Sequence, residues 1–497
     1  MSITFGTDGW RAVIADGFTF ERVRVAARAV ARYLQWDGRQ QLGVYREAPG
    51  ASYPSPYRPA SAGVVVGYDT RFLSDRFAAA VAEEIAAFGI PVWLSDAFGP
   101  TPAFSLAVRD RQAAASVILT ASHNPPEYNG LKLKPEYASS GLPAVMSALA
   151  AFVEREEQDT LAYPDIAGAP VERFSARAGF VEEIARLVDL DRIRACPYRV
   201  VVDPMYGAGQ GIVAPLLAGG AVHVEEIRGT LNPTFGGVNP EPIDRNLQAL
   251  AIALRSQSGG DGLRLGIALD GDADRVGAMD GSGRFYNSHE IFAIMLWHLV
   301  ERRGWTGGVV KTFSTSVMVE RLAKRFGLPY YETPIGFKYI VEHMLADDIL
   351  IGGEESGGIG IKNHIPERDG ILSGLLLLEA AAWEGESLPQ VLARIQEMVG
   401  QFAYDRIDLH LPSREVMQSF VQRLQSHAPA SFAGHKVTEV LDLDGVKLVF
   451  SDGWILFRPS GTEPVLRIYA EAPSVEMVRG LLEEGRGQAT GLKEVHS

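Results

Sequence analysis

The sequence predicts an α/β protein with three tandem domains built on mixed sheets, followed by a smaller C-terminal α+β domain. With 497 residues, the chain is too long for one hydrophobic core. A unit of strand, helix and strand begins three times, at the apolar runs 63–67, 198–202 and 309–311. Such units produce parallel or mixed sheets that are covered by helices.

The first unit illustrates the pattern. Its first strand, residues 63–67, is followed by a helix from Asp75 to Phe88 and by a second strand at residues 89–94. One face of the helix is apolar and consists of Phe77, Val81, Ile85 and Phe88. Their spacing of four, four and three residues is typical of an amphipathic helix.

The next two units repeat this order. The second predicts a strand, a helix and a strand at residues 198–202, 208–217 and 221–227. The third predicts the same elements at residues 309–311, 318–326 and 330–332. Residues 46–62 are rich in Pro, Ser, Ala and Tyr without periodicity, and we interpret them as a surface loop inserted in the first unit.

The C-terminal section has a different order of elements. After a strand near residue 401, it predicts a helix, three strands and a helix at residues 413–427, 447–450, 454–457, 466–470 and 474–484. This order is typical of an α+β domain. We expect the four domains to span residues 1–176, 177–284, 285–400 and 401–497.

The composition is that of an acidic globular protein. Hydrophobic residues make up 46% of the chain and charged residues 22%. The 61 acidic and 47 basic residues give a formal net charge of −14, which argues against nucleic acid or an anionic membrane as a partner. An acidic protein that binds an anionic substrate must gather basic side chains locally. The motifs described below contain Arg11, Lys132, Arg275 and Arg458.

Three features predict a cytoplasmic protein. The single cysteine, Cys196, cannot form an internal disulfide, as expected in a reducing compartment. No long apolar stretch occurs near the N-terminus, so no signal peptide is predicted. The most apolar helix-like run, residues 371–383, is too short to span a bilayer.

A serine-containing loop, residues 120–130, directly follows the apolar strand-like run 116–119. Its hydroxyl group, on Ser122, lies at the end of a buried strand, and Pro125 and Pro126 stiffen the backbone that follows. This setting suits a nucleophile or a phosphate carrier. The alternative interpretation is a polar turn with local side-chain-to-backbone hydrogen bonds.

A second loop contains three carboxylates at alternate positions, Asp270, Asp272 and Asp274, between two apolar runs. Without a cation these side chains would repel one another. Carboxylate oxygens suit Mg²⁺, Mn²⁺ or Ca²⁺ rather than Zn²⁺. The chain continues directly into the apolar run 276–279, which does not fit a helix-loop-helix calcium site. A solvated acidic turn is the alternative interpretation.

Two glycine-containing segments complete the set. Residues 352–358 place four glycines around Glu354, Glu355 and Ser356, so the backbone can approach a ligand closely. Residues 458–464 combine Arg458 with two hydroxyl groups in a tight turn, which suits a phosphate ester. Either segment alone is equally consistent with a linker or a turn between strands.

In this order and at these separations, the four segments resemble those of the α-D-phosphohexomutases, the family of phosphoglucomutase and phosphomannomutase. Residues 5–11 and 129–132 are also similar to that family. The resemblance extends from residue 5 to about residue 470. It implies four domains around a central cleft, with one motif from each domain.

The resemblance implies a reversible conversion of glucose 1-phosphate and glucose 6-phosphate. Ser122 would donate a phosphoryl group to form bound glucose 1,6-bisphosphate, which would turn end for end and return its other phosphate. The metal ligands implied for one Mg²⁺ per chain are Ser122, Asp270, Asp272 and Asp274. The small-molecule partner would be a sugar phosphate, and the enzyme a monomer or homodimer.

The resemblance also implies roles for other side chains. The implied catalytic residues are Arg11, His123, Lys132 and Arg275. The implied substrate-binding residues are Lys338, Glu354, Ser356, Arg458, Ser460, Gly461 and Thr462. Arg11 and Lys132 are both candidates for steering the proton of the attacking hydroxyl group.

Two departures from the family pattern favour glucose over mannose. Many relatives that accept both sugars have His at the position of Gly358, and residues 333–338 lack a histidine that some relatives carry. Phosphomannomutase and phosphoglucosamine mutase remain alternative functions. A metal-dependent sugar phosphatase and a non-catalytic sugar-phosphate-binding protein are the alternatives from other classes.

Overall fold

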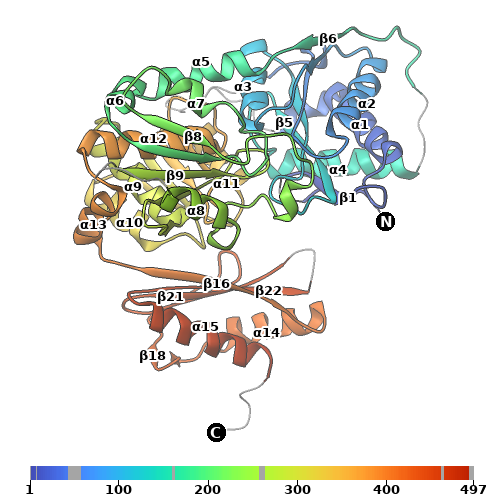
Figure 1. Ribbon diagram of the computed structural model, residues 1–497. Helices are drawn as coiled ribbons and strands as arrows, with labels where there is room; N and C mark the ends of the chain where they lie inside the picture. The colour runs from blue at the N-terminus through green and yellow to red at the C-terminus, as the bar shows by residue number, and fades with distance from the viewer. Residues whose placement is uncertain are drawn as a thin grey trace.

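The computed structural model describes residues 2–6, 8–42, 57–158, 163–256, 263–460 and 464–491. Within these ranges the chain forms four large sheets, of which the first three are mixed and the fourth is antiparallel. The three α/β domains lie together, and the C-terminal domain lies below them as a separate lobe (Figure 1). The predicted fold class, three mixed-sheet α/β domains and a C-terminal α+β domain, is therefore confirmed.

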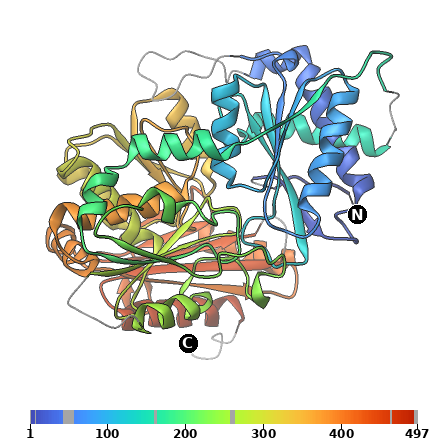
Figure 2. The ribbon, with the colours of Figure 1, turned by 45° about the horizontal axis from the view of Figure 1, so that its top comes forward.

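The first sheet has the strand order β1-β5-β4-β2-β3-β6. Its strands are β1 (Trp10–Val13), β2 (Val64–Tyr68), β3 (Val92–Ser95), β4 (Ala115–Leu119), β5 (Tyr128–Pro135) and β6 (Val171–Phe174). Its helices are α1 (Phe20–Gln35), α2 (Ser74–Ala87), α3 (Thr101–Arg111) and α4 (Pro143–Gln158). Helices α2 and α3 cover opposite faces of this sheet (Figure 2). Strands β4 and β5 pair antiparallel, with Ile118 opposite Lys132. The loop between them therefore places Ser122 just beyond the C-terminal end of β4.

The second sheet has the order β11-β10-β9-β7-β8. Its strands are β7 (Arg199–Asp203), β8 (His223–Glu226), β9 (Arg264–Leu269), β10 (Val276–Asp280) and β11 (Phe285–Tyr286). The helices of this region are α5 (Arg177–Leu187), α6 (Leu190–Ala195), α7 (Val213–Leu216) and α8 (Gln248–Ser256). Strands β9 and β10 form an antiparallel hairpin whose turn contains the three aspartates.

The helix predicted at residues 208–217 was too long. Only Val213–Leu216 is α-helical. Gly211 has a φ angle of +66°, in the left-handed region that a right-handed helix cannot use. Its neighbour Gly209 also packs closely, because an added Cβ would lie 2.6 Å from Leu269. These residues therefore form a tight loop instead of the first helical turns.

The third sheet has the order β13-β12-β14-β15. Its strands are β12 (Gly308–Thr312), β13 (Tyr330–Thr333), β14 (Ile349–Gly353) and β15 (Ile359–Ile361). Its helices are α9 (Ser288–Glu301), α10 (Val317–Arg325), α11 (Phe337–Ala346), α12 (Gly370–Glu384) and α13 (Leu388–Val399). The glycine-rich segment 352–358 joins β14 to β15.

The fourth sheet has the order β16-β22-β21-β20-β19. Its strands are β16 (Ala403–His410), β19 (Glu439–Leu441), β20 (Val446–Val449), β21 (Trp454–Pro459) and β22 (Val465–Ala472). Helices α14 (Arg414–Ser426) and α15 (Val475–Ala489) cover one face, away from the other domains (Figure 1). A small hairpin, β17 (Ser431–Phe432) and β18 (His435–Lys436), was not predicted.

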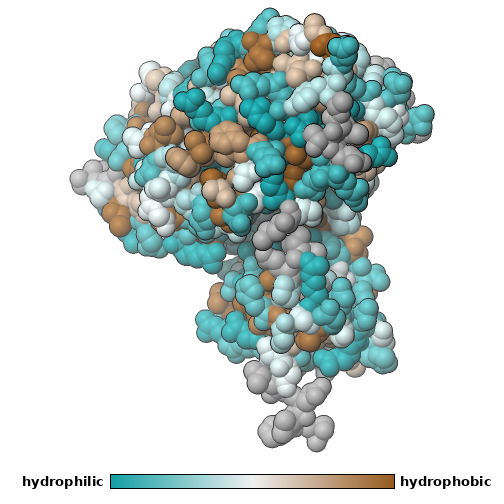
Figure 3. All heavy atoms as spheres, turned by 90° about the vertical axis from the view of Figure 1, so that its right-hand side faces the viewer, coloured by the Kyte–Doolittle hydropathy of each residue, from teal (hydrophilic) through white to brown (hydrophobic). Residues whose placement is uncertain are grey.

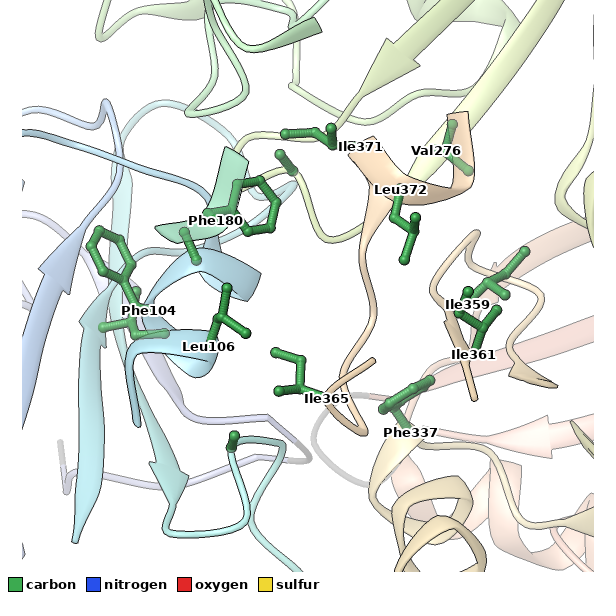
Figure 4. Packing of buried hydrophobic residues seen from close by; sticks show 14 of the residues in the cluster. Phe104, Leu106, Phe180, Val276, Phe337, Ile359, Ile361, Ile365, Ile371 and Leu372 are labelled. Atoms are coloured by element: carbon green, nitrogen blue, oxygen red, sulfur yellow. The ribbon is translucent and has the colours of Figure 1, made fainter. Parts of the chain in front are cut away.

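Hydrophobic packing joins the first three domains into one body. A continuous core runs through them. Leu106 of α3 and Phe180 of α5 lie on the side of the first domain that faces Ile365, in the segment that leads into α12 (Figure 4). The fourth domain has its own core. It meets the third domain through a smaller apolar cluster of Phe313, Trp454, Leu456 and Tyr469. The fourth domain accordingly projects from the broad upper lobe (Figure 3).

Two further expectations concern segments of the chain. Most of the loop predicted at residues 46–62 lies outside the described residues, and its described end contains a short 3₁₀ helix, Ala60–Ala62. Among the helices that the structure describes, none has both the length and the apolar character needed to cross a bilayer.

Candidate functional site

Ser122 lies at the contact between the first two domains. Its side chain is fully buried, and its Oγ donates a hydrogen bond to Oδ2 of Asp270 at 2.8 Å. The serine has a φ angle of +53°, which turns the chain sharply after β4. The two loops that the sequence singled out are therefore in direct contact, although 148 positions separate them.

Arg71 holds the serine loop in place, and the sequence did not single it out. Its guanidinium donates hydrogen bonds to the backbone carbonyls of Ser122, Asn124, Pro125 and Tyr128, at 2.7, 2.6, 2.8 and 3.0 Å. The arginine is buried. Because one planar group joins four carbonyls, the loop has a defined shape before any ligand binds.

The three aspartates form a buried cluster in which one oxygen atom of each lies within 4.8 Å of the others. Burial, and then Asp272 and Asp274, raise the pKa of Asp270 well above its usual range. Burial opposes ionisation of Asp272 too, but Lys132 lowers the pKa of this carboxyl. The cluster therefore gathers three carboxyl groups at a place where burial disfavours their ionisation.

The cluster fits a divalent cation. Within the described part of the chain, the buried Oδ1 atoms of Asp272 and Asp274 have no hydrogen-bond partner. Their Oδ2 atoms are occupied, since Thr101 and Lys132 bind that of Asp272 at 2.5 and 2.8 Å, and Lys132 binds that of Asp274 at 3.0 Å. Asp272 and Asp274 are thus each held by one oxygen and present the other, and hard oxygen ligands suit Mg²⁺.

Lys132 joins the serine-bearing domain to the aspartate loop. From β5 its Nζ reaches Oδ2 of Asp8 at 2.9 Å as well as the two aspartates. Burial alone would lower the pKa of Lys132, but Asp272, Asp274 and Asp8 raise it above its usual range. Asp8, in the family-like segment 5–11, was not among the predicted site residues.

The other predicted catalytic side chains lie around Ser122. Nδ1 of His123 is 3.4 Å from Oγ of Ser122, and desolvation, followed by Arg275 and Arg11, lowers the pKa of His123 well below its usual value. Nη1 of Arg11 donates to Oδ1 of Asn124 at 2.7 Å. Nε of Arg275 lies 3.7 Å from Oδ1 of Asp274. Positive charge therefore surrounds the serine and the aspartates.

The glycine-rich segment of the third domain reaches the same site. Glu354 is buried, and burial raises the pKa of its carboxyl although Arg368 and Arg275 oppose this. Ser356 is half-buried in the following turn, where Gly357 has a φ angle of +94°. Arg368, which sequence reasoning missed, donates to Glu354 at 3.2 Å.

The fourth segment lies apart from this cluster. In the described part of the chain, Arg458 pairs with Asp444 of its own domain at 3.0 Å. The backbone N–H of Ser460 donates to the carbonyl of Val465 at 2.9 Å. Gly461 and Thr462 lie outside the described residues. Lys338 is half-exposed in the first turn of α11, with Nζ 5.1 Å from the ring of Tyr339.

Comparisons with known proteins agree with this architecture. Models of the α/β/α domains I, II and III of phosphoglucomutase/phosphomannomutase match residues 50–160, 178–283 and 287–398, and the model of the C-terminal domain matches residues 417–487. These matches are to an enzyme class whose members are isomerases that move phosphate within one molecule.

Individual relatives cover nearly the whole chain. A phosphoglucomutase/phosphomannomutase of Thermococcus kodakarensis is 30% identical over 98% of each chain. A phosphoglucosamine mutase of Carboxydothermus hydrogenoformans is 30% identical over 97% of this chain and 98% of its own length. The crystal structure of a putative phosphomannomutase from Thermus thermophilus has a TM-score of 0.81 and 36% identity over 98% of each chain. The protein belongs to the phosphoglucomutase/phosphomannomutase family, the α-D-phosphohexomutases, and is an isomerase.

Proposed function

We propose that this phosphohexomutase interconverts glucose 1-phosphate and glucose 6-phosphate through a phosphoserine at Ser122 and a bound glucose 1,6-bisphosphate. One observation carries the proposal. The Ser122 hydroxyl lies 2.8 Å from Asp270, beside two buried carboxylate oxygens that have no hydrogen-bond partner among the described residues. A hydroxyl group placed at a cation site is suited to accept and donate a phosphoryl group.

Asp270, Asp272, Asp274 and an oxygen of phosphorylated Ser122 are the ligands we assign to Mg²⁺. When bound, Mg²⁺ would offset the negative charge that develops on the transferred phosphoryl group. Zinc favours nitrogen and sulfur ligands in tetrahedral sites, so an all-carboxylate set argues against it.

The surrounding cations of the chain supply the rest of the electrostatic environment. Lys132 and Arg275 are close enough to the aspartate loop to stabilise charge on the transferred group. Arg11 donates a hydrogen bond to Asn124 of the serine loop. Arg11 and Lys132 are both candidates for steering the proton of the attacking hydroxyl. His123 lies beside Ser122 and, with its lowered pKa, is neutral near pH ~7.

Two separate sites would bind the two ends of the substrate. Glu354 and Ser356 are proposed to bind ring hydroxyls near the reacting phosphate. Lys338, Arg458, Ser460, Gly461 and Thr462 are proposed to bind the phosphate that is not reacting. Such an arrangement accepts a bisphosphate in both orientations, which a mutase needs and a one-way phosphatase does not.

The sequence also supports a proposal for the cellular compartment and the partners of the enzyme. A single cysteine and the acidic composition support a cytoplasmic enzyme that binds a small sugar phosphate. A monomer or a homodimer is compatible with all four domains being present in one chain.

Parallel assays with glucose 1-phosphate, mannose 1-phosphate and glucosamine 1-phosphate test the proposal. We expect the highest kcat/KM with glucose 1-phosphate. A higher kcat/KM with either of the other sugars would leave the mutase activity in place but change the assigned substrate. The name of the Thermus thermophilus relative makes mannose 1-phosphate the first alternative. Release of inorganic phosphate without a 6-phosphate product would overturn the mutase mechanism itself.

A further inference from the structure

Arg368 binds three carboxylates that come from three different parts of the chain. It lies between β15 and α12 and is buried. Nη2 is 2.5 Å from Oδ2 of Asp8 and 2.8 Å from Oδ2 of Asp274, and Nη1 is 3.2 Å from Oε2 of Glu354. One rigid guanidinium therefore connects the first domain, the aspartate loop and the glycine-rich segment.

The contact with Asp274 determines which carboxylate oxygen is presented to a cation. Arg368 and Lys132 both bind Oδ2 of Asp274, at 2.8 and 3.0 Å. Its Oδ1 is the buried atom without a hydrogen-bond partner in the described chain. On Glu354, Arg368 engages Oε2 and not Oε1. The same side chain thus orients an aspartate of the metal cluster and the glutamate assigned to the sugar.

Gly358 is explained by the path of this arginine. A Cβ at position 358 would lie 2.2 Å from Cδ and 2.9 Å from Cγ of Arg368. The side chain cannot easily move aside, because three carboxylates hold its guanidinium. The Arg368 side chain therefore fills the space that a side chain at position 358 would need.

We propose that Arg368 is a positioning residue that couples the metal site to the sugar site, and that it requires glycine at position 358. The inference rests on the proposed function, since it assigns Asp274 to the metal and Glu354 to the sugar. Losing Arg368 weakens binding of both ligands, because both carboxylates lose the group that orients them. A purely structural arginine would lower stability without this joint effect.

Calorimetry of Mg²⁺ binding in the absence of substrate tests the part of the proposal that concerns the metal site. Arg368→Gln should lower Mg²⁺ affinity by about 10- to 100-fold, the range found for groups that orient metal ligands. Gly358→Ala should also lower Mg²⁺ affinity, although residue 358 has no side chain that could bind the ion, since the added methyl displaces the arginine. KM for glucose 1-phosphate should rise in both variants.

Two control variants separate positioning from folding. Arg303→Gln removes another arginine that pairs with a buried carboxylate, Glu379, outside the site, and should lower thermal stability with unchanged Mg²⁺ affinity. Gly480→Ala adds a methyl where nothing lies within 4 Å and should leave Mg²⁺ affinity unchanged, although Ala inside α15 should slightly raise thermal stability.

A double-mutant cycle tests whether Arg368 couples Glu354 to the metal site. Glu354→Gln should change Mg²⁺ affinity by at least about twofold in the wild-type background. In the Arg368→Gln background, the same substitution should leave Mg²⁺ affinity unchanged. Unaltered Mg²⁺ affinity in both Arg368→Gln and Gly358→Ala would overturn the proposal. If the wild-type enzyme itself bound no Mg²⁺, the proposed metal site would fail instead, so the two failures are distinguishable.

Discussion

Nε of Arg458 lies 3.0 Å from Oδ2 of Asp444, and the same oxygen accepts the backbone N–H of Ile335 at 2.9 Å. Ile335 belongs to the third domain, just before α11, whereas Asp444 and Arg458 belong to the fourth. One carboxylate therefore orients the arginine and anchors it to the neighbouring domain. If Arg458 binds a phosphate group, its position depends on how the two domains dock.

Arg458→Ala should raise KM for glucose 1-phosphate and also lower kcat, because a phosphate contact distant from the reacting atoms acts through positioning. A lost charge-assisted hydrogen bond is worth roughly 1.5–3 kcal/mol, or about 10- to 150-fold in kcat/KM. Steady-state kinetics measures this. Arg479→Ala, at an exposed arginine of α15, is the matched control. An unchanged kcat/KM in Arg458→Ala would leave the turn with a structural role alone.

Ser122→Ala should abolish the phosphoenzyme and lower activity by several orders of magnitude, since it removes the hydroxyl group assigned to carry the phosphoryl group. Intact-mass measurement of the purified wild-type protein should show one added phosphoryl group. The Arg458→Ala variant should still carry the added phosphoryl group, because its substitution lies in another domain. Full activity in Ser122→Ala would refute the carrier assignment.

Chelation by EDTA should stop turnover, and added Mg²⁺ should restore it. Asp272→Asn should weaken Mg²⁺ binding, since it removes one charge from a site made of three carboxylates. Zn²⁺ should support little turnover, because it favours tetrahedral geometry. Calorimetry and kinetics on the same preparations provide both readouts. Activity that persists after exhaustive chelation would contradict the metal assignment.

The junction of the third and fourth domains should make stability depend on pH. Nζ of Lys447 and Nζ of Lys311 share one oxygen of Glu332, at 3.2 and 2.7 Å. Burial, and then Lys311, lower the pKa of Lys447 to about 7, although Glu332 and Glu471 oppose this. In the unfolded chain a lysine titrates near pH ~10.4.

Between about pH 7 and 10 the unfolded chain therefore binds more protons at Lys447 than the folded protein does, and the free energy of unfolding rises with pH. Below this range both states carry the proton, so the dependence disappears. The stability of the wild type relative to Lys447→Met should increase by at most about 1.4 kcal/mol per pH unit. Urea unfolding of both proteins at intervals from about pH 6 to about pH 9 checks this. Parallel curves would show that Lys447 does not titrate in this range.

Local patterns predicted the elements that present the site. The run 116–119 and the run before Asp270 were correctly expected as strands, because buried strands next to polar loops leave a clear local signal. The helix at residues 208–217 was wrong for the opposite reason, since a left-handed Gly211 and close packing overrode the helical pattern.

By itself, the sequence determined the strand–helix units, the serine at a strand end and a cluster of three carboxylates suited to a cation. These depend on neighbours a few positions apart, whose spacing can be followed along the chain. Only the tertiary structure decided that Arg71 holds the serine loop and that Arg368 joins Asp8 to Asp274. Arg368 and Asp8 are 360 positions apart, so their contact depends on how whole domains pack and leaves no periodic trace in the sequence.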